Sequence, residues 1–193
     1  MTGAAVDEVA DGAGDLWVFG YGSLMWNPGV PTVEMVRARI HGYRRALCVR
    51  SYVHRGTEES PGLVLGLDRG GSCTGMAFRV PEAARSAAVE ALRARELVTH
   101  VYKERRLPIR LADGRVLVAL CYVIDRAHIQ YAGALSSEEA ALIVAHARGR
   151  SGENIDYVMN TLEHLRSMGI RDHWLEDVGR SVARLRAADS TTA

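Results

Sequence analysis

The stretch Leu16-Trp17-Val18-Phe19-Gly20-Tyr21-Gly22-Ser23-Leu24 has the most informative local pattern in the chain. Its first four residues are apolar and predict a short buried strand. Gly20 and Gly22 permit backbone angles that other residues rarely adopt, so we expect this strand to end in an exposed loop that runs to Ser23. The folded part of the chain therefore begins with a β-strand, and the rest of the sequence must supply the strands that pair with it.

Three common glycine motifs do not fit this loop. A dinucleotide-binding fingerprint needs a third glycine at position 25 and then a helix, but the chain has Met25 followed by Trp26-Asn27-Pro28. A nucleophile elbow around Ser23 needs glycines two residues away on each side, where the chain has Tyr21 and Met25. The chain also lacks a glycine-rich loop that ends in Gly-Lys-Ser or Gly-Lys-Thr, so no nucleoside triphosphate site is indicated. Two interpretations are left: a tight turn, or a concavity of backbone N–H groups that binds a carboxylate or a developing oxyanion.

Further strands are predicted on both sides of a helical segment. Short β-favouring stretches, separated by Gly, Pro, Ser and Asp residues, lie at Ala46–Val49, Leu63–Leu67 and Thr74–Val80. Later in the chain, Arg105–Leu111 and Val116–Ile124 flank Asp113-Gly114, which is a strong local signal for a tight hairpin turn. Together these stretches indicate a meandering sheet or a small barrel.

Helices are predicted between the strands and in the last third of the chain. Ser136 and Glu139 form a capping-box pattern for a helix that we expect to stop at Gly149. Two more helices carry apolar faces at 155–165, ending near Gly169, and at 174–185. The predicted fold class is α+β: a small mixed β-barrel or strongly curved sheet with flanking helices.

The predicted organisation is one domain preceded by a tail. Residues 1–15 are rich in Gly, Ala and Asp and lack periodic apolar positions, so we expect a flexible N-terminal tail. A chain of 193 residues with 48% hydrophobic residues can bury one core but hardly two independent ones. We therefore predict a single domain over residues 16–187.

Glu96 is the second feature of the sequence, after the glycine-containing loop, that could carry chemistry. The alanine-rich helix that follows Pro81 places Ala84, Ala88 and Leu92 four residues apart on one row, and Glu96 is the next residue of that row. A carboxylate on a buried face has a raised pKa and can accept and return a proton near neutral pH. The alternative interpretation is an ion pair with Arg93 or Arg95, or a helix end that turns outward.

Composition excludes several classes of function. Lys and Arg number 24 against 23 Asp and Glu, so no overall field attracts nucleic acid or an anionic membrane. No apolar run approaches the roughly 20 residues that cross a bilayer, and no leader pattern is apparent, so we expect a cytoplasmic protein. The seven histidines show no ligand spacing, which predicts no metal site. Cys48, Cys73 and Cys121 are expected to be reduced core residues.

Several pieces of the sequence together resemble the ChaC-type γ-glutamylcyclotransferases, over about residues 16–178. The matching pieces are Val18–Leu24, His54-Arg55-Gly56-Thr57 with Pro61-Gly62, Thr74-Gly75, Arg95-Glu96, Tyr102, Tyr131 and Ser151-Gly152-Glu153-Asn154. The chain departs from the family pattern at Leu47-Cys48, where many relatives have an aromatic pair, and before Tyr102, where it lacks a Gly-Gly.

The resemblance implies a γ-glutamylcyclotransferase-like catalytic domain that converts glutathione to 5-oxoproline and cysteinylglycine without a cofactor. Carried over by position, the catalytic acid/base is Glu96. The implied substrate-binding residues are Val18, Phe19, Gly20, Tyr21, Gly22, Ser23 and Tyr102. Two alternatives are kept: a cyclotransferase for other γ-glutamyl amines or dipeptides, and a non-catalytic γ-glutamyl-binding regulator associated with cation transport. The sequence does not indicate an oligomeric state.

Overall fold

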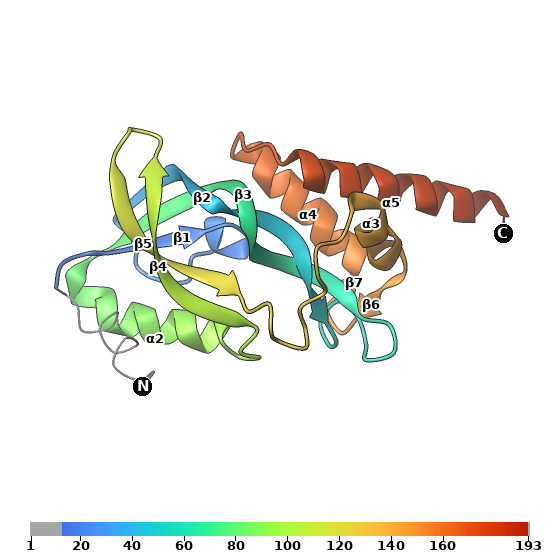
Figure 1. Cartoon of the computed structure of the whole chain (residues 1–193), viewed down its shortest axis with the longest axis horizontal. Helices are drawn as coiled ribbons and strands as arrows, with labels where there is room; N and C mark the ends of the chain where they lie inside the picture. The colour runs from blue at the N-terminus through green and yellow to red at the C-terminus, as the bar shows by residue number, and fades with distance from the viewer. Residues whose placement is uncertain (1–12, 193) are drawn as a thin grey trace. The chain divides into compact units, whose positions relative to one another are not determined.

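The structure is a computed structural model that describes residues 13–192, with side chains to residue 188. Its element order alternates strands and helices (Figure 1): β1 Leu16–Gly20, η1 Ser23–Met25, β2 Glu34–Ser51, β3 Gly62–Val80, η2 Glu82–Ala84, α2 Arg85–Glu96, β4 Tyr102–Leu111, β5 Val116–Ile124, α3 Ser137–His146, β6 Arg148–Gly149, β7 Gly152–Glu153, α4 Asn154–Ser167 and α5 His173–Thr192. Residues 1–12 of the predicted tail lie outside the described residues.

The chain folds into two compact units. The first unit contains the described residues up to Arg45 and Leu67–Asp125, and the second contains Ala46–Gly66 and the segment from Arg126. The single domain that was expected over residues 16–187 stays a prediction. Within the described residues, no helix is long and apolar enough to cross a bilayer.

The first unit is built on a closed barrel with the strand order β1-β3-β2-β4-β5. β1 is antiparallel to β3, with Val18 opposite Phe78, and the parallel pairing of Val18 with Leu120 of β5 closes the barrel. The predicted hairpin is confirmed, because β4 and β5 are antiparallel neighbours and Gly114 takes a φ of +94° in the turn between them. The predicted α+β barrel with flanking helices is therefore confirmed.

The sequence pattern underestimated β2 and β3. Residues 34–45 belong to β2 but are rich in charged residues, and of their apolar residues only Ala38 and Ile40 are buried. Leu63–Leu67 and Thr74–Val80 were expected as separate stretches, yet they belong to one strand. Gly70 and Gly71, with φ of +103° and +70°, lie within β3 without ending it.

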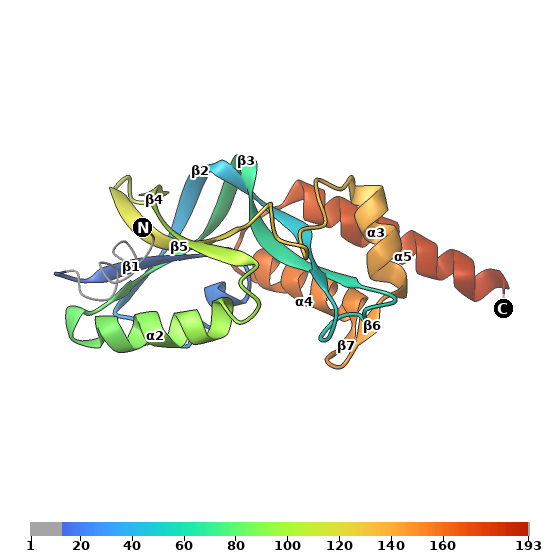
Figure 2. The same ribbon diagram turned by 60° about the horizontal axis from the view of Figure 1, so that its bottom comes forward.

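α2 runs along the barrel, as the two views in Figures 1 and 2 show. Ala88, Val89 and Leu92 of this helix are 0–2% exposed and pack with residues of β1, β3 and β5 in one core cluster. The buried face predicted for this helix is thus confirmed. Because the cluster includes Val18 and Leu24, it also fixes β1 and the loop that follows this strand.

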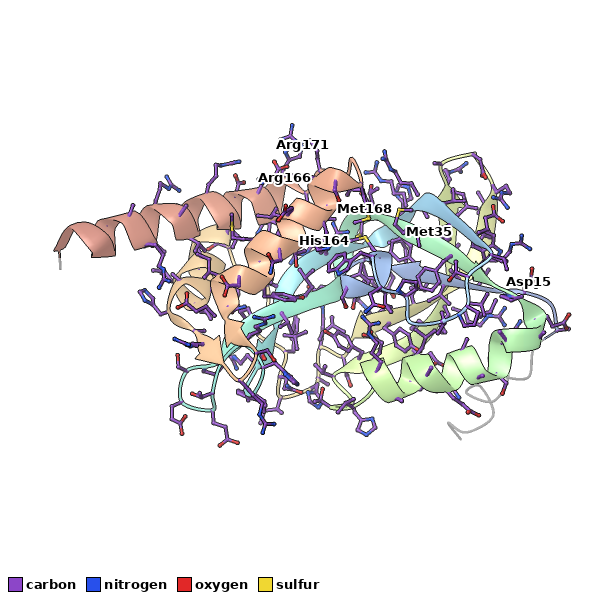
Figure 3. All side chains as sticks on the ribbon, turned by 180° about the vertical axis from the view of Figure 1, so that it is seen from behind. Asp15, Met35, His164, Arg166, Met168 and Arg171 are labelled. Carbon is purple, nitrogen blue, oxygen red and sulfur yellow. The ribbon has the colours of Figure 1, made fainter. Side chains whose placement is uncertain are left out.

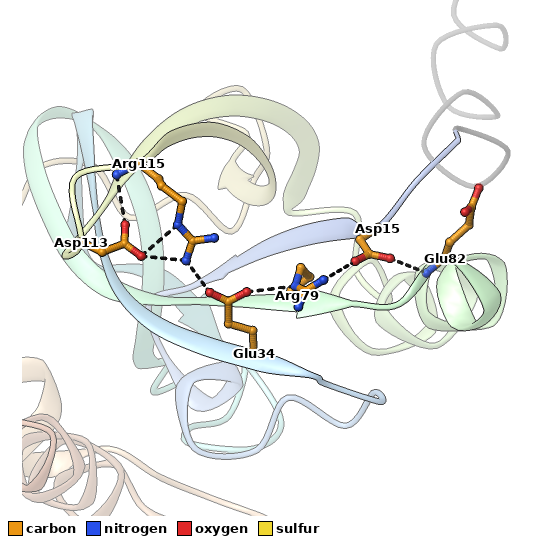
Figure 4. A network of polar contacts seen from close by, with 6 residues as sticks. All are labelled: Asp15, Glu34, Arg79, Glu82, Asp113 and Arg115. Carbon is orange, nitrogen blue, oxygen red and sulfur yellow. Dashed lines mark hydrogen bonds and ion pairs between the residues drawn. The ribbon is translucent and has the colours of Figure 1, made fainter.

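A chain of ion pairs joins the residue before β1 and the first residue of β2 to the end of β3 and the residue before β5 (Figure 4). Arg79 contacts Asp15 at 2.5 Å and Glu34 at 2.9 Å. Arg115 in turn pairs with Glu34 and with Asp113 of the hairpin turn. Hydrogen bonds from Arg115 hold the pKa of Glu34 and of Asp113 below the ordinary value of each carboxyl, so both stay ionised and the network persists at neutral pH.

The second unit contains the helices α3, α4 and α5, and two of its helix ends are formed as expected. The capping box of Ser136 and Glu139 is present at the start of α3. Gly169, with a φ of +65°, follows the end of α4, where Figure 3 shows Arg166 and Arg171 beside the turn to α5. The stop predicted at Gly149 is wrong, because α3 ends at His146 and Gly149 pairs with Gly152 in the short β6–β7 hairpin.

Close backbone approach explains the glycine at position 149. A Cβ there would lie 2.5 Å from the carbonyl carbon of His54, a distance that no side chain can occupy. Arg55 donates from Nη1 to the backbone oxygen of Ser151 at 2.7 Å, and His54 Nδ1 lies 3.0 Å from Ser151 Oγ. The segments 54–57 and 151–154, which are far apart in the sequence, are therefore packed together in the second unit.

Asn154 holds the beginning of β3 through its side-chain amide. Its Oδ1 accepts from the backbone N–H of Leu63 at 2.6 Å, and its Nδ2 donates to the backbone oxygen of Leu63 at 2.8 Å. Both residues are 0% exposed, so water cannot replace either bond.

Asn154→Ala is expected to lower the free energy of unfolding by about 2–6 kcal/mol, because it leaves two buried backbone groups without partners, each costing about 1–3 kcal/mol. Denaturant unfolding followed by circular dichroism would measure this. Asn160→Ala is the matched control, because Asn160 is exposed on the same helix and should change stability by less than about 0.5 kcal/mol. Equal effects of the two substitutions would contradict the role given to Asn154.

Candidate functional site

Glu96 is the last residue of α2, and its side chain is 16% exposed. The helix places it there because the row through Ala88 and Leu92 faces the core and continues to position 96. Burial removes water from the carboxylate and raises the pKa of Glu96, while the charge of Arg95 acts in the opposite direction. The net direction is upward, as the buried row predicts, so this carboxyl can hold a proton at a higher pH than an ordinary glutamate.

The ion pair considered as an alternative for Glu96 is present with one of the two candidate arginines. Arg95 Nε lies 3.3 Å from Glu96 Oε1. Arg93 instead forms two hydrogen bonds with Glu104 of β4, from Nε at 3.0 Å and from Nη2 at 2.8 Å. The pKa of Glu96 is raised despite this pairing, because burial of the carboxylate outweighs the attraction of Arg95. Water reaches the Arg95 side chain, which is 32% exposed, and weakens that attraction.

The loop predicted after β1 is a closed turn. Met25 donates its backbone N–H to Gly22 O at 2.9 Å, and Asn27 donates to Ser23 O at 2.9 Å. Tyr21 is buried, whereas Gly22 is half-buried and Ser23 is exposed. Among the hydrogen bonds of the described residues, the backbone N–H groups of Ser23 and Leu24 have no protein acceptor. The turn that was one interpretation of the sequence is therefore present, and it has two backbone donors without a protein acceptor in the described part of the chain. Binding of a carboxylate or an oxyanion by these donors stays a prediction.

A buried arginine supports this loop from the barrel side. Arg45 of β2 is 5% exposed, and its guanidinium donates from Nε to Tyr21 O at 2.6 Å and from Nη2 to Thr74 O at 2.7 Å. Gly75 lets β3 approach the loop, since a Cβ at that position would lie 2.2 Å from Gly20 O. Sequence reasoning missed Arg45, although a cation directly before the apolar run Ala46–Val49 was a usable signal.

A further polar group beside Glu96 was also missed. Tyr122 of β5 is fully buried, and its hydroxyl donates to Glu104 Oε2 at 3.4 Å. Burial raises the pKa of the Tyr122 hydroxyl, and the charges of Glu104 and Glu96 raise it further. A tyrosine inside the apolar strand Val116–Ile124 needs a partner for its hydroxyl, and this was the available signal.

The remaining residues predicted for substrate binding lie at different depths. Val18 and Phe19 are 0% exposed, so they support the loop from inside the core. Tyr102 is the first residue of β4 and packs, half-buried, against the core cluster that contains Val18 and Leu92. Glu96 and Ser23, by contrast, are brought together through a shared contact with Arg95.

The described residues contain no group of three or more His, Cys, Asp or Glu side chains that could hold a metal ion. Cys48, Cys73 and Cys121 are buried free thiols, as expected for reduced core residues.

The carboxyl of Glu96, with its raised pKa, and the nearby loop with unused backbone donors form an arrangement that can take up and return a proton.

Comparison with solved structures agrees with the barrel. A crystal structure of a yeast γ-glutamyl cyclotransferase specific to glutathione superposes with a TM-score of 0.79, covering 89% of this chain and 97% of that chain at 22% identity. At this identity the likeness shows the fold.

Comparison of sequences identifies the family. The glutathione-specific γ-glutamylcyclotransferase of Escherichia coli K12 is 36% identical over 174 residues, which is 90% of this chain and 75% of that protein. The glutathione-specific γ-glutamylcyclotransferase 1 of Danio rerio is 33% identical over 163 residues, with 82% and 83% coverage. The family model for ChaC-like protein matches residues 16–185. On these matches, the chain belongs to the ChaC-like protein family.

Proposed function

We propose that this protein is a glutathione-specific γ-glutamylcyclotransferase of the cytoplasm that releases 5-oxoproline and cysteinylglycine. The observation that carries the proposal is the position of Glu96: a partly buried carboxyl with a raised pKa, joined through Arg95 to a loop with unused backbone donors. The names of the relatives support glutathione as the substrate. Burying a carboxylate costs free energy, and a protein that only binds its ligand would gain nothing from this burial.

In the proposed reaction the α-amine of the γ-glutamyl group attacks its own γ-carbonyl. A C–N bond closes the five-membered lactam, and the bond between the γ-carbonyl and the cysteine nitrogen breaks. Glu96 takes a proton from the α-ammonium group, which makes the nitrogen nucleophilic, and returns it to the departing nitrogen. The protons that the α-ammonium loses are regained by the new amine of cysteinylglycine, so the reaction needs no co-reactant.

The protein mainly has to hold the substrate bent. Nucleophile and electrophile belong to one molecule, and oriented intramolecular reactions reach effective molarities of about 10⁵–10⁸ M. In this proposal the N–H groups of Ser23 and Leu24 bind a carboxylate or the developing oxyanion, and Gly20, Tyr21, Gly22 and Tyr102 complete the binding residues. Val18 and Phe19 belong to this site as its support.

The purified protein is expected to release 5-oxoproline from reduced glutathione without added metal or nucleotide, and to keep full activity in a chelator. Chromatographic detection of 5-oxoproline measures this, and γ-glutamyl-alanine at equal concentration tests the choice of substrate. Faster turnover of γ-glutamyl-alanine would favour a cyclotransferase for other γ-glutamyl compounds. Binding of glutathione without turnover would favour the non-catalytic regulator, and loss of activity that zinc restores would contradict the mechanism.

A further inference from the structure

Arg95 makes three polar contacts that meet at the candidate site. Its Nη1 donates to the backbone oxygen of Asn27 at 2.7 Å, its Nη2 donates to Ser23 Oγ at 2.7 Å, and its Nε lies 3.3 Å from Glu96 Oε1. The turn that it contacts is closed by the hydrogen bond from Asn27 N to Ser23 O. The planar guanidinium therefore binds both ends of one turn and the neighbouring carboxylate at the same time.

Glu96 has a particular need for such a restraint. It occupies the final position of α2, and the last turn of a helix has carbonyls without intrahelical donors and is the part that opens most easily. The partial negative charge at a helix C-terminus also repels a carboxylate. A contact that connects this helix end to another element would restrict the positions open to the Glu96 carboxylate.

We propose that Arg95 is a positioning residue that fixes the carboxylate of Glu96 at one distance from the Gly20–Ser23 loop. This inference rests on the proposed function, since it assumes that Glu96 transfers the proton and that the loop holds the γ-glutamyl group. Arg95 acts through its neighbours: it holds the turn of Ser23 and Asn27 and the end of α2 as one rigid group. Proton transfer depends on this spacing because a displacement of about 1 Å can cost roughly 10²-fold in rate.

The charged and titratable groups near Glu96 come from three elements. α2 supplies Arg95, and β5 supplies the buried hydroxyl of Tyr122. That hydroxyl also contacts Glu104 of β4, which is paired with Arg93. Arg95 is the cation that lowers the pKa of Glu96 against the effect of burial. Removing Arg95 should therefore raise the pKa of Glu96, and replacing it with lysine should keep the pKa near its wild-type position.

Three variants test the proposal by their kcat, KM and pH profiles with glutathione. Arg95→Met keeps the apolar stem and removes every donor, and we expect kcat/KM to fall roughly 10²-fold, with the acid limb of the profile moved to higher pH. Arg95→Lys should keep the acid limb in place and restore part of kcat, because an ammonium group cannot span all three partners. Ser23→Ala alone should slow turnover. The double variant Ser23→Ala with Arg95→Met should be no slower than Arg95→Met alone, because the contact between the two residues is already lost.

The matched control is Arg106→Met, the same change at an exposed arginine of β4, which should leave kcat and KM unchanged. Wild-type kcat, KM and acid limb in Arg95→Met, in an enzyme that Glu96→Gln inactivates, would overturn the positioning role while leaving the proposed function standing. A lower melting temperature with unchanged kinetics would overturn it as well. If Arg95→Met does not fold, Arg95→Lys and Ser23→Ala decide: wild-type kinetics in both would refute the proposal. No turnover by the wild type, or full turnover by Glu96→Gln, would refute the proposed function and this inference with it.

Discussion

Glu96→Gln should give a folded protein that still binds glutathione but turns it over at least roughly 10²-fold more slowly, the lower end of general acid–base catalysis. The amide has nearly the same shape as the carboxyl, and its oxygen can still accept from Arg95 Nε. It cannot take up a proton, so the substitution removes proton transfer and little else. Steady-state measurement of kcat and KM, with 5-oxoproline as the detected product, tests this expectation.

Glu90→Gln is the matched control for this experiment. Glu90 lies on the same helix but is exposed, so the same change of charge should leave kcat nearly unaltered. Wild-type turnover in Glu96→Gln, or an equal loss in Glu90→Gln, would remove the assignment of Glu96 as the base.

The pH profile gives a second readout of the same residue. Burial raises the pKa of Glu96 above the ordinary value of a glutamate, and kcat/KM reports the ionisation of the free enzyme. The wild-type profile should therefore have an acid limb above the range that an exposed glutamate would give, and this limb should disappear in Glu96→Gln. An acid limb that is unchanged in the variant would assign the ionisation to another group.

Stability separates the catalytic interpretation of Glu96 from a structural one. Because the pKa of Glu96 is raised in the folded protein, the contribution of this group to stability is fully present below its unfolded pKa and is lost as the pH rises through the raised value. At neutral pH the ionised carboxylate thus costs stability. Glu96→Gln should keep or raise the melting temperature, whereas loss of a structural ion pair would lower stability by up to about 1 kcal/mol and leave kcat intact.

Gly22→Val should remove substrate binding while the protein stays folded. A β-branched side chain at this half-buried position would stand beside the backbone donors of the loop and exclude the γ-glutamyl group. We expect kcat/KM to fall about 10²–10³-fold, comparable to the loss of one oxyanion donor. Gly22→Ala serves as the steric control and should give a smaller loss. A normal KM in Gly22→Val would mean that the loop is only a turn.

Most of the local structure followed from spacing and capping residues. The hairpin around Asp113-Gly114, the capping box at Ser136 and the buried row of α2 each depend on residues close together in the chain, and all three are present. The errors concern segments whose partners are distant. Residues 34–45 of β2 look polar because one face is exposed, and Gly149 looked like a helix stop because its close contact with His54 is invisible in the local sequence.

The sequence by itself determined which groups could carry chemistry in this protein. The row of apolar residues in α2 placed Glu96 at the edge of a core, and the glycines after β1 left backbone donors open, because both features follow from local periodicity and backbone freedom. Only the tertiary structure decided how they are joined. Arg95 reaches Asn27 and Ser23 across 68 and 72 residues of chain, and Arg45 supports the loop from another strand. Such contacts depend on which surfaces the closed barrel brings together, and the pattern of residues along the chain does not contain that information.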